Sequence, residues 1–153
     1  MTDLIAQIDA AFGARPYPGD DNITHHPCTE CAEMAAYFKG RSWRSVTGEE
    51  LRLEGQGDSL FTVPAYCYFL PAYLTAAIRE PEAADVCVDH LTYRFGPKED
   101  DAWGRGRLGE ILSELSRTER EAALAYFRFE LSRDPEDFQG FCARAIRGLE
   151  ATL

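Results

Sequence analysis

The sequence predicts an all-α fold for residues 1–153, a single compact domain of about six or seven helices around a kinked, aromatic-rich central helix. Three observations support this prediction. Apolar residues recur at steps of three and four along most of the chain. Most of these segments begin with Thr, Ser or Pro, and several end at Gly. A convincing alternation of apolar and polar residues, as in a half-buried strand, is not found.

The first helix is predicted over residues 2–12, where Thr2 can cap the helix and Gly13 ends it. Residues 14–24 are expected to form a loop, because they contain two prolines and a run of polar turn formers. The apolar side chains of the helix fall on one face, which consists of Leu4, Ile5, Ile8, Ala11 and Phe12.

A second helix is predicted to start at Pro27, whose missing N–H is not needed in a first turn. It is expected to run to Lys39 and to stop at Gly40. Trp43 follows in a short connection and is expected to fold back onto the apolar face of this helix. That face consists of Cys31, Met34, Ala35 and Phe38.

A short third helix is predicted after Thr47 and Glu50, which have the spacing of a capping box. The next segment, Ser59–Ile78, has twenty residues without a charge, which is the length of a membrane span. Its two prolines, its three tyrosines and the lack of a flanking Lys or Arg cluster favour a buried core helix instead. We expect this central helix to begin at Pro64 and to kink or break at Pro71.

The next helix is predicted over residues 82–94, although the alternation in Asp85–Asp89 also fits a minor strand. Residues 96–107 are expected to form a long loop, since they combine charges of both signs with three glycines. Trp103 is the lone aromatic residue of this loop. It is our candidate for an exposed partner-binding anchor, and burial under the domain is the alternative.

Two further helices are predicted near the C-terminus. Ser116 and Glu119 have the spacing of a second capping box. Asp134 and Pro135 have the pattern of a cap followed by a first-turn proline, so the last helix is expected to start there. Its apolar residues form one stripe at steps of three and four, namely Phe138, Phe141, Cys142, Ala145, Ile146 and Leu149.

Acidic residues outnumber basic ones by 26 to 16, which gives a formal net charge of −10 with His neutral. This balance argues against nucleic-acid binding, which needs a basic surface, and against docking on an anionic membrane. A basic protein partner is compatible with it, because opposite fields raise association rates. The five cysteines, an odd number, and the acidic start of the sequence argue against a secreted disulfide scaffold, so we expect a cytoplasmic protein with reduced thiols.

The densest cluster of reactive side chains lies between His25 and Cys31. Two thiols three residues apart at a helix start, beside two imidazoles, have the softness and spacing for Zn²⁺, and a helix N-terminus favours the thiolate. The candidate metal ligands are therefore His25, His26, Cys28 and Cys31. This is half of a usual closed site, and the alternative is that Cys31 packs inward while the histidines hydrogen-bond near the helix start.

One catalytic interpretation of this cluster is rejected, and thiol redox chemistry is left as a minor alternative. Pro27-Cys28-x-x-Cys31 matches the second half of the zinc-deaminase signature, but the His-x-Glu that must precede it is missing. Thioredoxin-like redox pairs share the spacing, but that fold requires a βαβ unit, which the sequence does not predict.

Five segments form a pattern along the chain: Ile8–Phe12, His26-x-Cys28-x-Glu30-Cys31, Phe38-x-Gly40-x-x-Trp43, Phe69-Leu70-Pro71-Ala72-Tyr73-Leu74 and Leu115-Ser116-x-x-x-Arg120. This pattern covers most of the chain and resembles a family of small acidic bacterial proteins of unknown function. The Leu-Pro-Ala-Tyr-Leu core is its most specific piece. The resemblance implies a bacterial source and a shared architecture, and it assigns no catalytic residue.

The leading functional expectation is a non-enzymatic acidic interaction protein, such as an immunity- or antitoxin-like protein that neutralises a basic partner. It depends on the net charge of −10 and on the lack of an assembled catalytic motif. One alternative is a small zinc-binding protein that uses Cys28, Cys31 and a histidine. The other is an enzyme whose site the sequence does not reveal. Zinc is the one cofactor that these alternatives imply.

Overall fold

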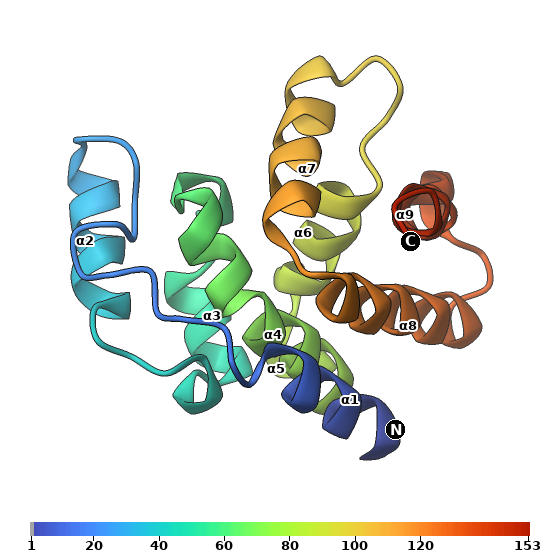
Figure 1. Ribbon diagram of the computed structural model, residues 1–153, viewed down its shortest axis with the longest axis horizontal. Coiled ribbons are helices and arrows are strands. Elements are labelled where there is room, and N and C mark those ends of the chain that lie inside the picture. Colours follow the sequence, from blue (N-terminus) through green and yellow to red (C-terminus); the bar gives the residue numbers. More distant parts are fainter. Residues whose placement is uncertain (1) are drawn as a thin grey trace.

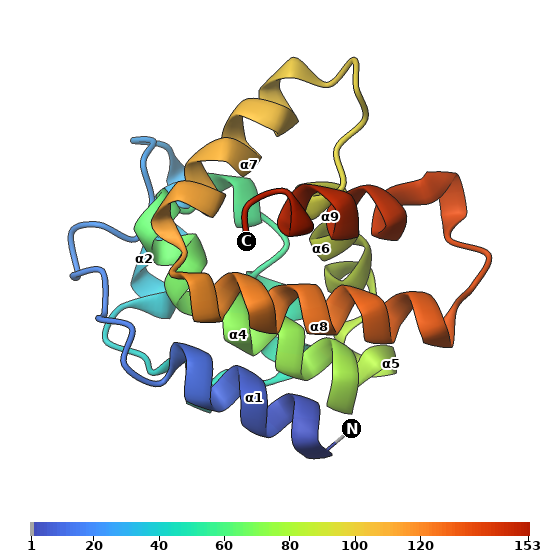
Figure 2. The same cartoon turned by 45° about the vertical axis from the view of Figure 1, so that its right-hand side comes forward.

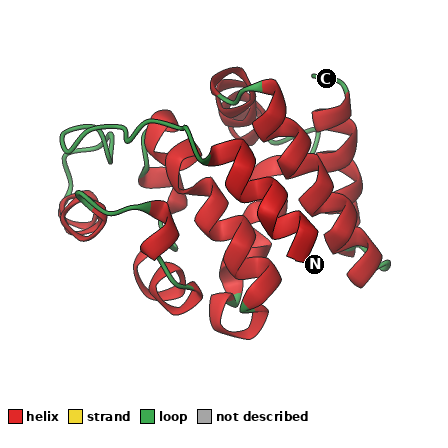
Figure 3. Cartoon of the chain, turned by 60° about the horizontal axis from the view of Figure 1, so that its bottom comes forward, coloured by secondary structure: helices red, strands yellow, loops and turns green. Residues whose placement is uncertain are grey.

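Helices dominate residues 2–153, the part of the chain that this computed structural model describes, and an isolated bridge between Thr24 and Phe61 is the one β-type pairing there (Figures 1 and 3). The predicted all-α class is confirmed. The 3-10 helices are η1 (Trp43–Ser45), η2 (Asp58–Leu60) and η3 (Phe138–Gly140). The α-helices are α1 (Thr2–Phe12), α2 (Thr29–Phe38), α3 (Gly48–Glu54), α4 (Val63–Arg79), α5 (Pro81–Ala84), α6 (Val86–Phe95), α7 (Ala102–Glu114), α8 (Arg117–Arg133) and α9 (Phe141–Glu150).

The core is built around α4, in which thirteen of seventeen residues are buried. The helix begins as expected, because the Thr62 side chain accepts a hydrogen bond from the backbone N–H of Ala65 at 3.1 Å and Pro64 lies in the first turn. It continues through Pro71, so of the predicted kink or break, the break does not occur. Neighbouring helices enclose α4, and their packing outweighs the hydrogen bond that Pro71 cannot donate. Within residues 2–153, none of the helices has the length and apolar character that crossing a membrane requires.

The first helix packs against helices from the middle and the end of the chain. In Figure 2, α1 runs beneath both α4 and α8. Ile8 and Phe12 are fully buried in this interface. These two positions belong to the apolar face that the helical spacing predicted.

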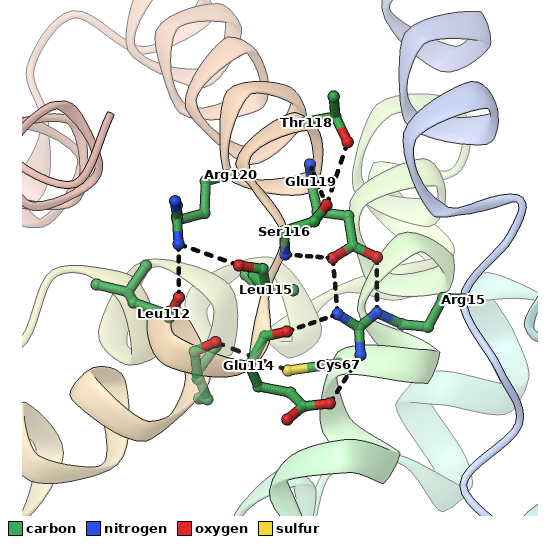
Figure 4. Close-up of polar contacts among 10 residues, drawn as sticks. Arg15, Cys67, Leu112, Glu114, Leu115, Ser116, Thr118, Glu119 and Arg120 are labelled. Atoms are coloured by element: carbon green, nitrogen blue, oxygen red, sulfur yellow. Dashed lines mark hydrogen bonds and ion pairs between the residues drawn. The ribbon is translucent and has the colours of Figure 1, made fainter.

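A buried ion pair fixes the segment that follows α1 (Figure 4). The Nε and Nη2 atoms of Arg15 donate to the two carboxylate oxygens of Glu119 at 2.7 and 2.6 Å. Nη2 also donates to the backbone carbonyl of Glu114 at 2.9 Å. One guanidinium group therefore joins the end of α1 to the junction between α7 and α8.

Both predicted capping boxes are confirmed. The Thr47 hydroxyl accepts from the backbone N–H of Glu50, and the Glu50 carboxylate accepts from the N–H of Thr47 at 2.8 Å. Ser116 and Glu119 form the same reciprocal pair at the start of α8, with 2.7 Å from Ser116 N to Glu119 Oε2. These motifs depend on contacts between residues three positions apart, which the sequence alone specifies.

The prediction of a loop over residues 96–107 is wrong for its second half, because α7 begins at Ala102. The Asp101 side chain accepts a hydrogen bond from the N–H of Gly104 at 2.8 Å and so caps the helix. Ile111 and Leu115 are buried in the core at its other end. A cap and a packed end thus overcome the low helix propensity of the glycines.

The predicted start of the last helix at Pro135 is also wrong. The Asp137 carboxylate accepts hydrogen bonds from the N–H groups of Cys142 and Ala143 at 2.8 and 2.9 Å, so α9 begins at Phe141. Phe138 consequently lies outside the apolar stripe and is exposed. The rest of the stripe is buried or half-buried as predicted.

The helix predicted over residues 82–94 is divided into α5 and α6, because Asp85 between them has a φ of +44°, which is not helical. Residues 86–89 are helical, so the alternative minor strand is not formed. The second helix starts later than predicted as well. Pro27 precedes it, and Cys28, with an extended backbone, is its N-cap.

Candidate metal centre

The loop before α2 is held in place by the segment that leads into α4. The backbone N–H of Thr62 donates to Ile23 O at 2.9 Å, and the N–H of His25 donates to Leu60 O at 3.2 Å. Thr24 and Phe61 form an antiparallel bridge between these bonds. The residues around His26 are therefore positioned by backbone contacts to a buried part of the chain.

Three of the four predicted ligands converge at the start of α2. One potential ligand atom from each of His26, Cys28 and Cys31 lies within 4.8 Å of the other two. His26 is exposed, Cys28 is half-buried and Cys31 is buried. The cluster thus reaches from the protein core to solvent.

The fourth predicted ligand, His25, makes a different contact. Its Nε2 atom lies 3.0 Å from the backbone carbonyl oxygen of Ser59, which is hydrogen-bond distance. This contact belongs to the pairing that holds the loop. In the structure His25 is a loop residue beside the cluster, as in the predicted alternative of a histidine that hydrogen-bonds near the helix start.

Cys28 and Cys31 have opposite electrostatic environments. The Cys28 sulfur accepts the backbone N–H of Cys31 at 3.3 Å, and this hydrogen bond together with the contact to His26 lowers the pKa of the Cys28 thiol to about 7. Burial raises the pKa of the Cys31 thiol, and the hydrogen bond with Cys28 raises it further. At neutral pH, Cys28 is thus a ready source of thiolate.

The remaining cysteines lie in the core, away from this cluster. Burial raises the pKa of Cys67 to about 12, of Cys87 to about 11 and of Cys142 to about 12. Among residues 2–153, no other His, Cys, Asp or Glu joins the three to complete a set of four. An ion held here would keep a coordination position for water or another ligand.

Trp103 is exposed, with 61% of its surface accessible, and not buried under the domain. Its ring lies 5.2 Å from the guanidinium carbon of Arg94. Arg94 in turn donates twice to Oδ2 of Asp58, at 3.2 and 3.1 Å, and both residues are buried. His90 Nδ1 lies 3.6 Å from the other carboxylate oxygen of Asp58.

Sequence reasoning missed this group around Asp58. The contacting residues are more than 30 positions apart in the sequence, and no local motif connects them. Asp58 lies on η2 while His90 and Arg94 lie on α6, so only tertiary packing brings these charges together.

A scan against protein-family models and searches of curated proteins and of solved structures find no match to this chain. The resemblance to small acidic bacterial proteins therefore stays a prediction.

Proposed function

We propose that this protein binds Zn²⁺ through His26, Cys28 and Cys31. The observation that supports the proposal is the convergence of one imidazole and two sulfur atoms to within 4.8 Å of one another. Thiolate and imidazole are the ligands that Zn²⁺ prefers in proteins. Two thiolates bound to one tetrahedral ion at about 2.3 Å are about 3.8 Å apart, so small side-chain rotations suffice to close the site.

The loop geometry also supports this function. The backbone N–H of Cys31 already donates to the Cys28 sulfur at 3.3 Å, an interaction that stabilises a metal-bound thiolate as well as a free one. The backbone bonds of residues 23–25 to residues 60–62 hold the loop before any ion binds. Less conformational entropy is lost on binding when the ligands are preorganised.

The test is a zinc titration of metal-free protein against a competing chromophoric chelator. The wild type is expected to bind one equivalent, and Cys28→Ser should weaken binding by more than about 100-fold because a thiolate ligand is lost. Serine is a favoured N-cap residue, so this variant keeps the start of α2. Cobalt-loaded wild-type protein should show a thiolate-to-metal charge-transfer band that Cys28→Ser lacks.

A second test compares His26→Asn, which removes a proposed ligand, with His25→Asn as its matched control. The two residues are adjacent, but only His26 belongs to the cluster. His26→Asn should weaken zinc binding much more than His25→Asn, because His25→Asn loses only the side-chain contact to Ser59 O and no metal ligand. Equal zinc affinity in wild type and Cys28→Ser would rule out the proposed site.

A second candidate function, docking of a basic protein partner, rests on a different surface. Three of the exposed large apolar side chains are Tyr93, Trp103 and Phe138, with accessible fractions of 50, 61 and 71%. Tyr93 lines three hollows, of about 90, 200 and 280 Å³. We call Tyr93, Trp103 and Phe138 with these hollows the aromatic face. Exposed Trp and Tyr beside small hollows are typical of interaction hot spots.

The charge of the aromatic face favours a basic partner. Its hollows are lined by two side chains with permanent positive charge, Arg94 and Lys98, and Arg94 is already bound to Asp58. The acidic side chains that line them are Asp58, Asp89, Asp101, Glu130, Asp134 and Asp137. Four of these acids, Asp58, Asp101, Glu130 and Asp137, already accept hydrogen bonds within the protein, while Asp89 and Asp134 are exposed. Arginine side chains of a partner can pair with these two exposed acids and stack on the exposed rings.

This function predicts that affinity capture from a lysate of the encoding organism recovers a basic protein in stoichiometric amount. The Tyr93→Ala/Trp103→Ala double variant should lose that protein, and added salt should weaken its capture. Leu53→Ala, which changes an exposed apolar residue on α3, is the control and should retain it. A partner retained by the double variant, or self-association of the chain in sedimentation through this face, would contradict the proposal.

A further inference from the structure

A further cavity of the protein lies apart from both surfaces described above. It is bounded by α1, η1 and the second half of α4 and has a volume of about 670 Å³. This is within the range of about 300–1,000 Å³ that is typical of small-molecule sites. Its apolar lining consists of Ile5, Ala6, Trp43, Val46, Ala72 and Ala76.

The lining is aliphatic along most of its length because α4 presents alanines there. Ala72 and Ala76, one helical turn apart, are buried and leave space where larger side chains would fill the gap. Trp43, which is also buried, forms one wall. A chain of methylene groups fits such a lining by excluding water from it.

The two acidic side chains of the cavity are already engaged. Asp9 accepts a hydrogen bond from Nε of Arg44 at 2.7 Å, and the Arg44 guanidinium carbon lies 4.4 Å from the Trp43 ring centroid. Glu80 accepts from the backbone N–H of Gly48 at 3.1 Å. A cationic ligand would therefore have to break an existing interaction.

The remaining cation of the cavity is Arg79, the last residue of α4. In residues 2–153 it makes neither an ion pair nor a side-chain hydrogen bond, although six other arginines form ion pairs shorter than 3 Å. Arg79 is an exposed residue of the cavity lining. The cavity thus has an apolar body and one available positive end.

We propose that this cavity binds an aliphatic carboxylate, with its hydrocarbon chain against Ala72, Ala76 and Trp43 and its carboxylate on Arg79. The planar guanidinium group of arginine presents parallel N–H donors that match a carboxylate in geometry and charge. The site is independent of the metal centre, because none of the zinc ligands lines the cavity.

Trp43 gives a direct readout of binding. The chain has two tryptophans, and the other one, Trp103, lies on the aromatic face. In a Trp103→Phe protein, Trp43 is the only tryptophan, so its emission reports on the cavity. Decanoate, added below the concentration at which it forms micelles, should change this emission in a saturable way.

Two comparisons among ligands test the assigned chemistry. Each methylene added from hexanoate through octanoate to decanoate should tighten binding about fourfold, as expected for burial of hydrocarbon. Decanol should bind at least about tenfold more weakly than decanoate, because it lacks the charge that Arg79 recognises.

Two variants then locate the site. Ala6→Phe places a ring at the exposed edge of the cavity, where it does not disturb the core, and should abolish binding. Arg79→Gln should remove the preference for decanoate over decanol, while Arg147→Gln, an exposed arginine on α9, should keep it. Circular dichroism checks that each variant is folded.

The proposal is overturned if decanoate gives no saturable change in Trp43 emission. It is equally overturned if Ala6→Phe binds decanoate like the parent protein. Equal affinity for decanoate and decanol in the parent protein would remove Arg79 from the site and contradict the assigned ligand class.

Discussion

Replacing Arg15 with methionine should lower the free energy of unfolding by about 3–5 kcal/mol, as is typical when one partner of a buried ion pair is removed. The side chains of Arg15 and Glu119 are only 8 and 5% accessible, and two hydrogen bonds of 2.7 and 2.6 Å join them (Figure 4). Methionine replaces the aliphatic part of arginine but leaves the Glu119 carboxylate buried without its counter-charge. Urea denaturation measures the change.

The matched control is Arg117→Met. Arg117 ion-pairs with Glu121 at 2.9 Å on the same helix, but both side chains are exposed. An exposed pair of this kind contributes about 0.3–0.5 kcal/mol. If Arg15→Met destabilises the protein no more than Arg117→Met does, the buried pair is not a main source of stability.

The effect of Arg15→Met should depend on pH. Burial by itself raises the pKa of Glu119, but the hydrogen bonds from Arg15 and from the backbone N–H of Ser116 outweigh it, and the pKa lies below its ordinary value of 4.5. A carboxylate with a depressed pKa contributes stability above its unfolded pKa and loses it as the pH falls through the folded value. The difference in stability between wild type and Arg15→Met should therefore shrink below pH 4.5.

Replacing Phe69 with alanine is expected to lower the free energy of unfolding by about 3–5 kcal/mol. Phe69 is fully buried on α4. Its ring centroid lies 4.9 Å from that of Phe38 on α2 and 5.5 Å from that of Phe61. Truncation to alanine leaves a cavity and removes the ring contacts to Phe38 and to Phe61. Phe61 belongs to the segment that holds the loop before α2.

Chemical denaturation of Phe69→Ala measures the loss, with Phe138→Ala as the control. Phe138 is exposed, so its truncation should change the stability by no more than about 0.5 kcal/mol. The Phe69→Ala variant should also weaken zinc binding, because Phe61 pairs with Thr24 and so positions the loop before Cys28. If Phe69→Ala lowers the free energy of unfolding no more than Phe138→Ala does, the aromatic cluster is not a main source of stability.

The sequence predicted the parts of the fold that depend on neighbouring residues. The capping boxes at Thr47 and Ser116 are local, and so is the apolar spacing of α1. The start of α9 was missed because Asp134-Pro135 has the right composition for a cap, while the carboxylate of Asp137 makes the actual hydrogen bonds. Propensity could not reveal α7, whose Ile111 is buried only through tertiary packing.

The candidate sites likewise differ in whether their residues are near or far apart in the sequence. His26, Cys28 and Cys31 lie within six residues of sequence, so their spacing alone predicted that they would meet. Arg15 and Glu119 are 104 positions apart, and nothing in either segment indicates the partner. The cavity beside Trp43 likewise exists only once α1 and η1 have packed on α4. Groups assembled by distant packing are invisible to periodicity and motifs.

The position of α1 has a consequence for how the chain matures. Ile8 and Phe12 are covered by α4 and α8, and α8 ends at Arg133. During translation, α1 therefore has no completed docking surface until α8 has been synthesised. Until then, the apolar face of α1 is exposed to solvent unless a chaperone covers it. Nascent chains stalled before α8 should therefore be especially prone to aggregate.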